Sequence, residues 1–126
     1  MFNVDGNINY WKNTAESNLV TAGILFDNNQ LVEGLFFCHL CIEKILKALV
    51  VKETKTAPPK SHNLKHLVNL SKIEVTKDEE LFMAVLMKYM LEGRYPEYYP
   101  KAPQKKIAQE YHMKTNTLLE CLKAKL

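Results

Sequence analysis

The stretch FFCHLCIEKILKALVV, at residues 36–51, decides the fold of this chain. Within the longer segment from residue 31 to about residue 53, apolar side chains occupy nearly the whole circumference of a helix, which is typical of a helix buried on all sides. The exceptions are four residues that form one narrow charged stripe. His39, Glu43 and Lys47 are spaced by four and lie in a row, and Lys44 lies one step around the helix. We therefore expect a central helix that is polar along one line only.

Helical periodicity recurs on both sides of this segment. Apolar residues at intervals of three and four predict further helices over residues 8–26, 63–71, 76–92 and 103–123. Thr76 and Glu79 form a capping box, Gly93 stands where a helix often ends in left-handed geometry, and Pro58-Pro59 forces an extended connection. No strand pattern or internal repeat occurs. The sequence predicts one all-α domain over residues 1–126, an antiparallel up-and-down bundle of four long helices and a short one.

The composition is that of an ordinary globular domain, with 47% hydrophobic and 25% charged residues, and it argues against a disordered or fibrous chain. The segment Met1–Gly6 lacks the basic start and apolar run of a signal peptide. No stretch of about 18 uncharged apolar residues offers a membrane span. We expect a cytoplasmic protein.

Three cysteines cannot pair off evenly, and Cys38 and Cys41 lie in the apolar helix, where thiols usually act as small buried hydrophobes. With His39 between them they look like half of a zinc site. A tetrahedral site needs further ligands, however, and only Cys121 lies elsewhere. The sequence thus favours a reducing compartment and predicts no metal and no cofactor.

The net charge of +3 is too small to indicate nucleic-acid binding by itself. The segment from Lys101 to Leu126 holds six lysines against Glu110 and Glu120, about +4 in all. A solvated helix face is favoured here over an electrostatic footprint.

The charged stripe of the central helix has two interpretations. In the first, Glu43 and Lys47 form an ion pair on the only wet strip of the helix, worth a few tenths of a kcal/mol, about 0.2–0.5. In the second, the strip faces a partner subunit or an anionic ligand held by Lys44 and Lys47. The residues alone leave both open.

Two histidines, His62 and His66, follow the proline turn at a spacing that places them on one helix face. N-terminal capping or surface packing is favoured for His62. No serine or cysteine nucleophile and no acidic orienter stand in evident register, so no catalytic triad is predicted.

Arg94 is the only arginine of the chain, and it follows the fourth helix, where a guanidinium can bond the last carbonyls or reach a phosphate. Tyr95, Tyr98 and Tyr99 come next in a proline-rich loop. Covering an edge of the core is favoured for them over stacking on bases.

Three segments, in this order, resemble motifs of the HEPN domains (higher eukaryote and prokaryote nucleotide-binding). Cys41 to Leu49 is similar to the helix-two pattern of a small residue, Glu-Lys, an apolar pair and Lys-Ala-Leu. Ser61-His62-Asn63-Leu64, followed by Leu67, resembles the next motif, and Arg94-Tyr95-Pro96 resembles the third. The resemblance covers about residues 10–122 and implies a helical bundle, commonly a homodimer, often paired with a minimal nucleotidyltransferase as in toxin–antitoxin systems.

The resemblance also implies several activities. Some HEPN members are metal-independent ribonucleases that use an arginine followed after four to six residues by a histidine, paired across a dimer. Here the corresponding positions after Arg94 hold Tyr99, Pro100 and Lys101, and His112 is too distant in sequence. That gap lowers the expectation of an enzyme, unless His39 or His62 substitutes in space.

Other members bind nucleotides, and the resemblance then implies phosphate-facing groups at Lys44, Lys47, His62, Arg94 and Tyr95. The leading hypothesis is a dimerising, nucleotide-binding module that pairs with a nucleotidyltransferase. The alternatives are an endoribonuclease toxin with a displaced histidine and a structural bundle without ligand.

Overall fold

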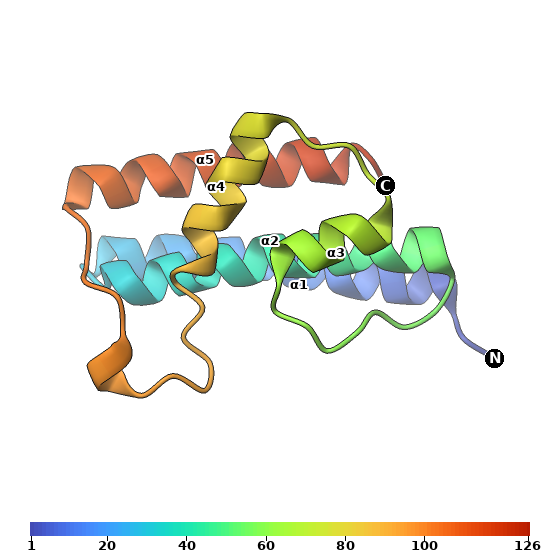
Figure 1. The fold of residues 1–126 in the computed structure, drawn as a ribbon, viewed down its shortest axis with the longest axis horizontal. Helices are drawn as coiled ribbons and strands as arrows, with labels where there is room; N and C mark the ends of the chain where they lie inside the picture. The colour runs from blue at the N-terminus through green and yellow to red at the C-terminus, as the bar shows by residue number, and fades with distance from the viewer.

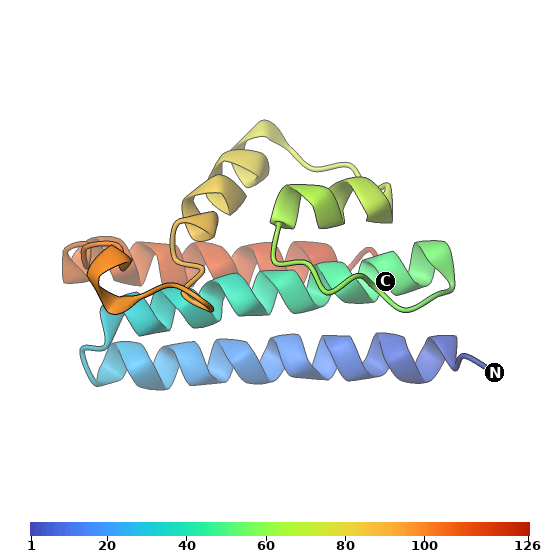
Figure 2. The ribbon, with the colours of Figure 1, turned by 60° about the horizontal axis from the view of Figure 1, so that its bottom comes forward.

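The computed structural model describes residues 1–126, and every regular element in it is a helix. The elements are α1 Val4–Asp27, α2 Leu31–Thr54, α3 Leu64–Ser71, α4 Lys77–Met87, a 3-10 turn η1 Pro96–Tyr98, and α5 Lys105–Lys123. Figure 1 shows α1, α2 and α5 along the long axis, with α5 running in the same direction as α2 and opposite to α1. The short helix α3 and the inclined helix α4 lie over α2 in Figure 2. The all-α bundle predicted from the sequence is confirmed.

Helix α2 is the centre of the core, as its pattern predicts. It contacts each of the other four α-helices. Fourteen of its residues are buried, including Leu35, Ile42, Ile45 and Leu46 with no exposed surface. Because most of its circumference is covered and a stripe through Phe37, Leu40 and Lys44 is partly exposed, most apolar side chains of α2 are removed from water, which is the main stabilising contribution to a bundle of this kind.

Helix starts are fixed by local polar side chains. Asn3 accepts a hydrogen bond from the Gly6 amide at α1, and Asn63 accepts one from the His66 amide at α3. At α4 the predicted capping box is confirmed, since Thr76 accepts from the Glu79 amide while the Glu79 carboxylate accepts from the Thr76 amide. Such caps satisfy amides that have no partner within the helix.

The predicted end of the fourth helix is wrong. Helix α4 stops at Met87 rather than near Glu92, and Gly93 has the expected left-handed backbone (φ +78°) but in a later turn. The early stop places Tyr89 and Leu91 in buried positions. Tertiary packing of these two side chains outweighs the helical propensity of the segment.

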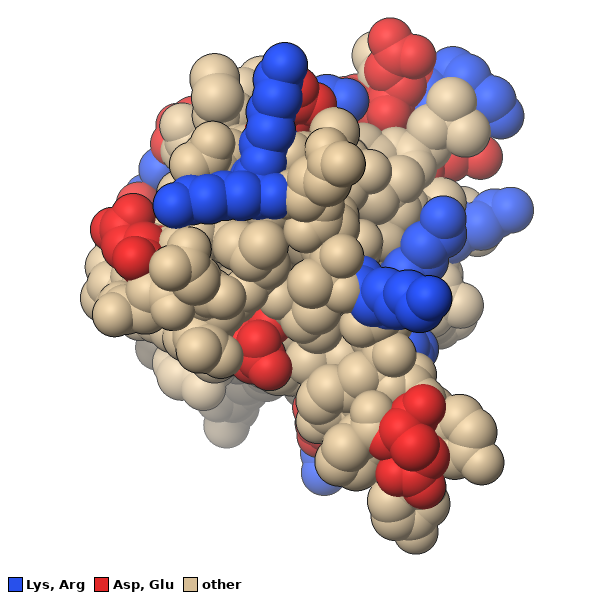
Figure 3. Space-filling model, turned by 90° about the vertical axis from the view of Figure 1, so that its left-hand side faces the viewer, with Lys and Arg blue, Asp and Glu red and all other residues tan.

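The lysines of α5 and its approach form a solvated face, as favoured from the sequence. Lys105, Lys106 and Lys114 are exposed, and Lys123 pairs with Glu16 of α1 at 3.2 Å. Figure 3 views the end of the molecule where α5 begins, and there basic and acidic side chains are interspersed. None of the helices is long and apolar enough to span a membrane.

Candidate functional site

The charged stripe of α2 is not the wet strip that one interpretation of the sequence expected. His39 and Glu43 have no exposed surface, and Lys47 is 5% exposed. Only Lys44 keeps a partly exposed side chain, at 19%. The stripe is covered by α1 on one side and by the connection between α2 and α3 on the other, so it forms a buried polar cluster.

Glu43 is the centre of this cluster. Its Oε2 accepts hydrogen bonds from Lys44 Nζ at 2.9 Å and from Lys47 Nζ at 3.1 Å, and its Oε1 accepts one from His62 Nδ1 at 2.8 Å. Burial alone would raise the pKa of this carboxyl group. The bonds from His62 and Lys44 and the charges of both lysines outweigh that effect and hold the pKa below its ordinary value. Glu43 is therefore an ionised carboxylate at neutral pH.

His39 lies one helical turn before Glu43 and is neutral. Burial lowers the pKa of its imidazole to about 4, although the Glu43 charge opposes the shift. Its Nε2 donates to the backbone carbonyl of His62 at 3.0 Å, so in the neutral ring Nδ1 carries no proton. The 3.8 Å contact of Nδ1 with Glu43 is for that reason not an ion pair.

His62 belongs to the connection rather than to α3, and α2 holds it at two points. Its carbonyl accepts from His39, and its ring donates to Glu43. The expected capping role belongs instead to the next residue, Asn63. Because Nδ1 donates its hydrogen bond to Glu43, Nε2 is the ring nitrogen left for another partner, and the side chain is 35% exposed.

Trp11 of α1 covers the two lysines. Lys47 Nζ lies 5.3 Å and Lys44 Nζ 5.6 Å from the centre of its ring, distances at which a cation is attracted to an aromatic face. The indole Nε1 is buried without a hydrogen-bond partner. Trp11 lies in the first predicted helix, over residues 8–26, and nothing in the sequence indicates that its ring meets Lys44 and Lys47.

The loop after α4 reaches the same cluster. Glu92 Oε2 lies 3.3 Å from His62 Nε2, a contact that the sequence did not predict. Two residues later, Arg94 donates from Nη1 to the Lys88 carbonyl at 3.2 Å, which confirms the expected bond to the last carbonyls of α4. Arg94 follows Glu92 by two residues, and its guanidinium bonds Lys88 rather than a residue of the cluster.

Other residues singled out in the sequence lie apart from the cluster or in the open. His66 is exposed on α3, and His112 packs against the ring of Phe26 near the start of α2. The tyrosines do not cover the core as favoured: Tyr95 and Tyr98 are 70% and 68% exposed. Of the histidines, His62 alone combines a place in the cluster with an exposed ring.

The cysteines behave as small hydrophobes. Cys38 and Cys41 are fully buried, and burial raises the pKa of Cys38 to about 12 and that of Cys41 further. Cys121 is exposed on α5. No group of three or more His, Cys, Asp or Glu side chains is arranged to hold a metal ion.

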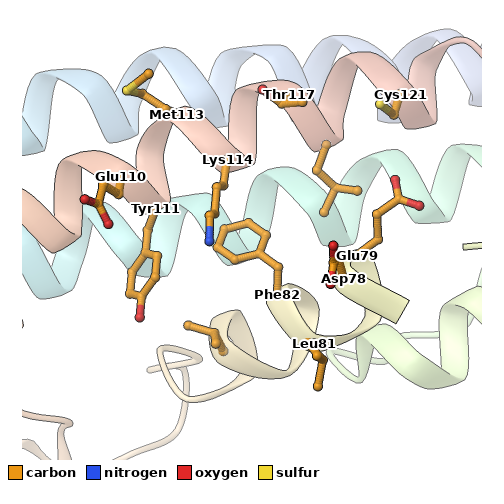
Figure 4. Close-up of a pocket in the computed structure, with 12 residues that line it drawn as sticks. Asp78, Glu79, Leu81, Phe82, Glu110, Tyr111, Met113, Lys114, Thr117 and Cys121 are labelled. Carbon is orange, nitrogen blue, oxygen red and sulfur yellow. The ribbon is translucent and has the colours of Figure 1, made fainter. Parts of the chain in front are cut away.

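A separate groove of about 850 Å³ lies between α4 and α5. Figure 4 shows Phe82 at its centre, with Lys114 reaching over the ring at 5.9 Å and Asp78, Glu79 and Glu110 at the rim. None of the cluster residues around Glu43 lines it. The groove and the cluster are different regions of the molecule.

Fold and site together define an all-helical domain built around a buried Glu-Lys-His cluster. A model of the HEPN domain family matches residues 8–125, nearly the whole chain. The chain belongs to the HEPN domain family. Comparisons with curated proteins and with solved structures gave no match.

Proposed function

We propose that this HEPN protein is a nucleotide-binding module that works as a homodimer and pairs with a minimal nucleotidyltransferase, in the manner of a toxin–antitoxin pair. The nucleotide phosphates bind at the partly exposed Lys44 and His62 side chains, with Arg94 and Tyr95 supplied by the neighbouring loop. Lys47 is nearly buried and does not contact the ligand; it contributes its positive charge to the cluster.

The observation that carries this proposal is the gathering of two lysines and one histidine around a single buried carboxylate, Glu43. Glu43 faces two ammonium groups, so one positive charge near it is not neutralised within α2. The side chains of Lys44 and His62 are partly exposed, at 19% and 35%, and a phosphate at His62 Nε2 takes the place of the exposed Glu92 carboxylate, which lies 3.3 Å from it. Phosphate oxygens accept well from such charged donors.

The sole tryptophan supplies the test, because Trp11 lies against Lys44. Titration of the purified protein with ATP, and separately with inorganic phosphate, is followed by tryptophan fluorescence and checked by calorimetry. We expect saturable binding of ATP that weakens about tenfold or more in Arg94→Ala and Lys44→Ala, since a charged hydrogen bond is worth about 1.5–3 kcal/mol. Lys106→Ala, an exposed lysine of α5, is the matched control and leaves binding unchanged. If neither method shows saturable binding of ATP, the nucleotide-binding proposal is overturned, and the remaining alternative is a structural bundle without ligand.

Pairing with a nucleotidyltransferase has its own test, since it does not depend on ligand binding. If a minimal nucleotidyltransferase is encoded next to this chain, the two proteins are co-expressed with a tag on one of them. We expect them to co-purify at a fixed ratio. Independent elution of the two chains would end this part of the proposal.

A second candidate, a metal-independent ribonuclease, is favoured by one specific contact. The Glu43 carboxylate orients His62 through Nδ1, as a general base requires, and Nε2 reaches a substrate once the exposed Glu92 carboxylate, 3.3 Å away, moves aside. In this reading His62 takes a proton from the ribose 2′-hydroxyl while Arg94 stabilises the charge on the phosphate. His62 thus takes the role of the histidine that is missing after Arg94.

This candidate predicts cleavage of RNA in the presence of a metal chelator, lost in both His62→Ala and Arg94→Ala. His66→Ala, an exposed histidine four residues away, is the control and keeps full activity. RNA that stays intact through prolonged incubation with the wild-type protein excludes the ribonuclease without affecting the nucleotide-binding proposal.

A further inference from the structure

Helices α4 and α5 lie beside each other without packing closely. Helix α4 packs on α2 and α3, and it reaches α5 through the rings of Phe82 and Tyr111, whose centres are 5.9 Å apart. The space between the two helices is the groove of about 850 Å³ described above. Its edges are apolar and open to solvent, since Leu81 of α4 is 54% exposed and Met113 of α5 is 71% exposed. The fold itself leaves these apolar side chains uncovered.

The charges that line this groove are mostly negative. Three carboxylates stand there against one ammonium group, a balance of −2 in a chain of net charge +3: Asp78, Glu79, Glu110 and Lys114. None of the three carboxylates forms an ion pair within the chain. The other charged residues of α4 and α5 have the opposite balance, four lysines against two glutamates: Lys77, Lys105, Lys106, Lys123, Glu80 and Glu120. On these two helices the excess of negative charge is therefore confined to the groove.

The carboxylates stand at the two ends of the groove. Figure 4 shows Glu110 at one end and Asp78 and Glu79 at the other, with apolar side chains between them. Cys121, which lines the groove near Asp78, follows Glu110 by 11 residues of α5, or about 16 Å at about 1.5 Å per residue. The groove thus offers an apolar surface about three helical turns long with a carboxylate at each end.

We propose that this groove binds a short amphipathic helix of a partner protein, which covers Phe82 with its apolar face and carries a basic residue at each end. Helices dock into apolar grooves through side chains three and four residues apart. In this arrangement Leu81 and Met113 flank the apolar face of the bound helix, and its terminal lysines or arginines meet the carboxylates at the two ends. Lys114, whose ammonium lies 5.9 Å from the centre of the Phe82 ring, repels a basic residue at the middle of the helix.

The groove fits a protein segment better than a small molecule or a nucleotide. Small-molecule pockets enclose most of the ligand surface, whereas the side chains at both edges of this groove are more than half exposed. An anionic ligand is repelled by the excess of carboxylates. The cluster around Glu43 does not line the groove, so partner binding here is independent of nucleotide binding there.

The experiment uses two synthetic peptides of about 12 residues, a length of about three helical turns. Both carry leucines three and four residues apart; one has a lysine at each end, and the matched control has glutamate at these two positions. Each is titrated into the full chain, and NMR of isotope-labelled methionine methyl groups is combined with calorimetry. We expect a saturable shift of the Met113 signal, an unshifted Met90, which lies outside the groove, and binding of the lysine peptide tighter than that of the glutamate peptide by about tenfold or more.

Charge reversal on the protein tests the carboxylates directly. In the double variant Asp78→Lys with Glu110→Lys, the glutamate peptide should bind more tightly than the lysine peptide. Both carboxylates are exposed and neither is paired, and a thermal melt checks that the variant is folded. Glu120→Lys, an exposed position of α5 outside the groove, is the matched control and should keep the wild-type preference.

Four results overturn the inference. The first is the absence of saturable binding of the lysine peptide, and the second is equal binding of the two peptides. The third is binding that leaves the Met113 signal unchanged, which places the peptide elsewhere. The fourth is a Met113 signal that shifts when the protein alone is diluted, which identifies a second copy of this chain as the occupant. No step uses a nucleotide, so failure of the proposed nucleotide binding leaves this test unaffected.

Discussion

The imidazole of His62 donates to the buried carboxylate of Glu43 over 2.8 Å, although the two residues are 19 positions apart in the chain. This bond joins two of the segments that carry the HEPN resemblance, the Glu-Lys pair of α2 and the Ser-His-Asn-Leu segment before α3. The spacing of His39 and Glu43 by four lets one helix face hold both the carbonyl and the ring of His62.

Replacement of the central carboxylate should destabilise the fold strongly. In Glu43→Gln the ammonium group of Lys47 stays buried but loses its charged partner, which typically costs about 3–5 kcal/mol. The free energy of unfolding is measured by urea denaturation. Glu53→Gln, at an exposed pair with Lys72, is the control and should change the free energy of unfolding by less than about 1 kcal/mol. Equal stability of the two variants would contradict a buried ion cluster.

Stability should fall on acidification in two overlapping windows. The pKa of His39 is lowered to about 4 in the folded protein, against about 6.5 in the unfolded chain, so the unfolded chain binds more protons between these values. The free energy of unfolding should decrease from about pH 6.5 to about pH 4, by about 3 kcal/mol for this group. Glu43, with a lowered pKa, stabilises the fold above its unfolded value of about 4.3, and this stabilisation is lost as the pH falls through its folded pKa.

The variant His39→Gln isolates the first window. Its amide keeps a donor toward the His62 carbonyl but does not titrate. Urea unfolding at several pH values should show a shallower slope between about pH 6.5 and pH 4 than the wild type has. An unchanged slope would mean that His39 is not the buried neutral imidazole described above.

Close packing of α1 on α2 depends on a glycine. A Cβ at Gly34 would come within 2.6 Å of the Phe26 ring, whereas one at Gly23 would meet His112 at an ordinary 3.5 Å. We expect Gly34→Ala to cost about 1–3 kcal/mol of unfolding free energy through overpacking. Gly23→Ala should gain about 0.5–1 kcal/mol from helix propensity. Thermal melts of both variants measure the difference, and a stabilised Gly34→Ala would refute the close contact.

The three thiols should differ in reactivity. Cys121 is exposed, while burial raises the pKa of Cys38 to about 12 and also that of Cys41, so that neither forms a thiolate at neutral pH. A chromogenic disulfide reagent should therefore titrate one thiol rapidly in the native protein and the others only on unfolding. Rapid reaction in Cys121→Ser would show that the core thiols are accessible.

Much of the fold could be predicted from local signals. The all-round apolar pattern of α2 identified the core helix, and Thr76 with Glu79 identified the start of α4. The end of α4 could not be predicted, because it depends on the burial of Tyr89 and Leu91 against distant residues. The exposure of the loop tyrosines could not be predicted for a similar reason, since a loop pattern does not show which side of the loop packs against the protein.

The candidate site was predictable only in its parts. The spacing along α2 placed His39, Glu43 and Lys47 on one face, but it could not show that Trp11 and the connection before α3 cover that face. The acidic orienter of His62 was therefore missed, although Glu43 itself was singled out. Glu92 was missed because the predicted helix continued through it. Contacts between separate elements decide all three points, and one sequence carries no direct record of them.

Nitrogen-resolved NMR of the histidine side chains, with and without ATP, tests most directly whether Glu43 orients the His62 ring for nucleotide binding. We expect His62 to carry its proton on Nδ1 in the free protein and its Nε2 signal to shift saturably with ATP, while the exposed His66 does not respond. Equal responses of His62 and His66, or no response of His62 at saturating ATP, would contradict it.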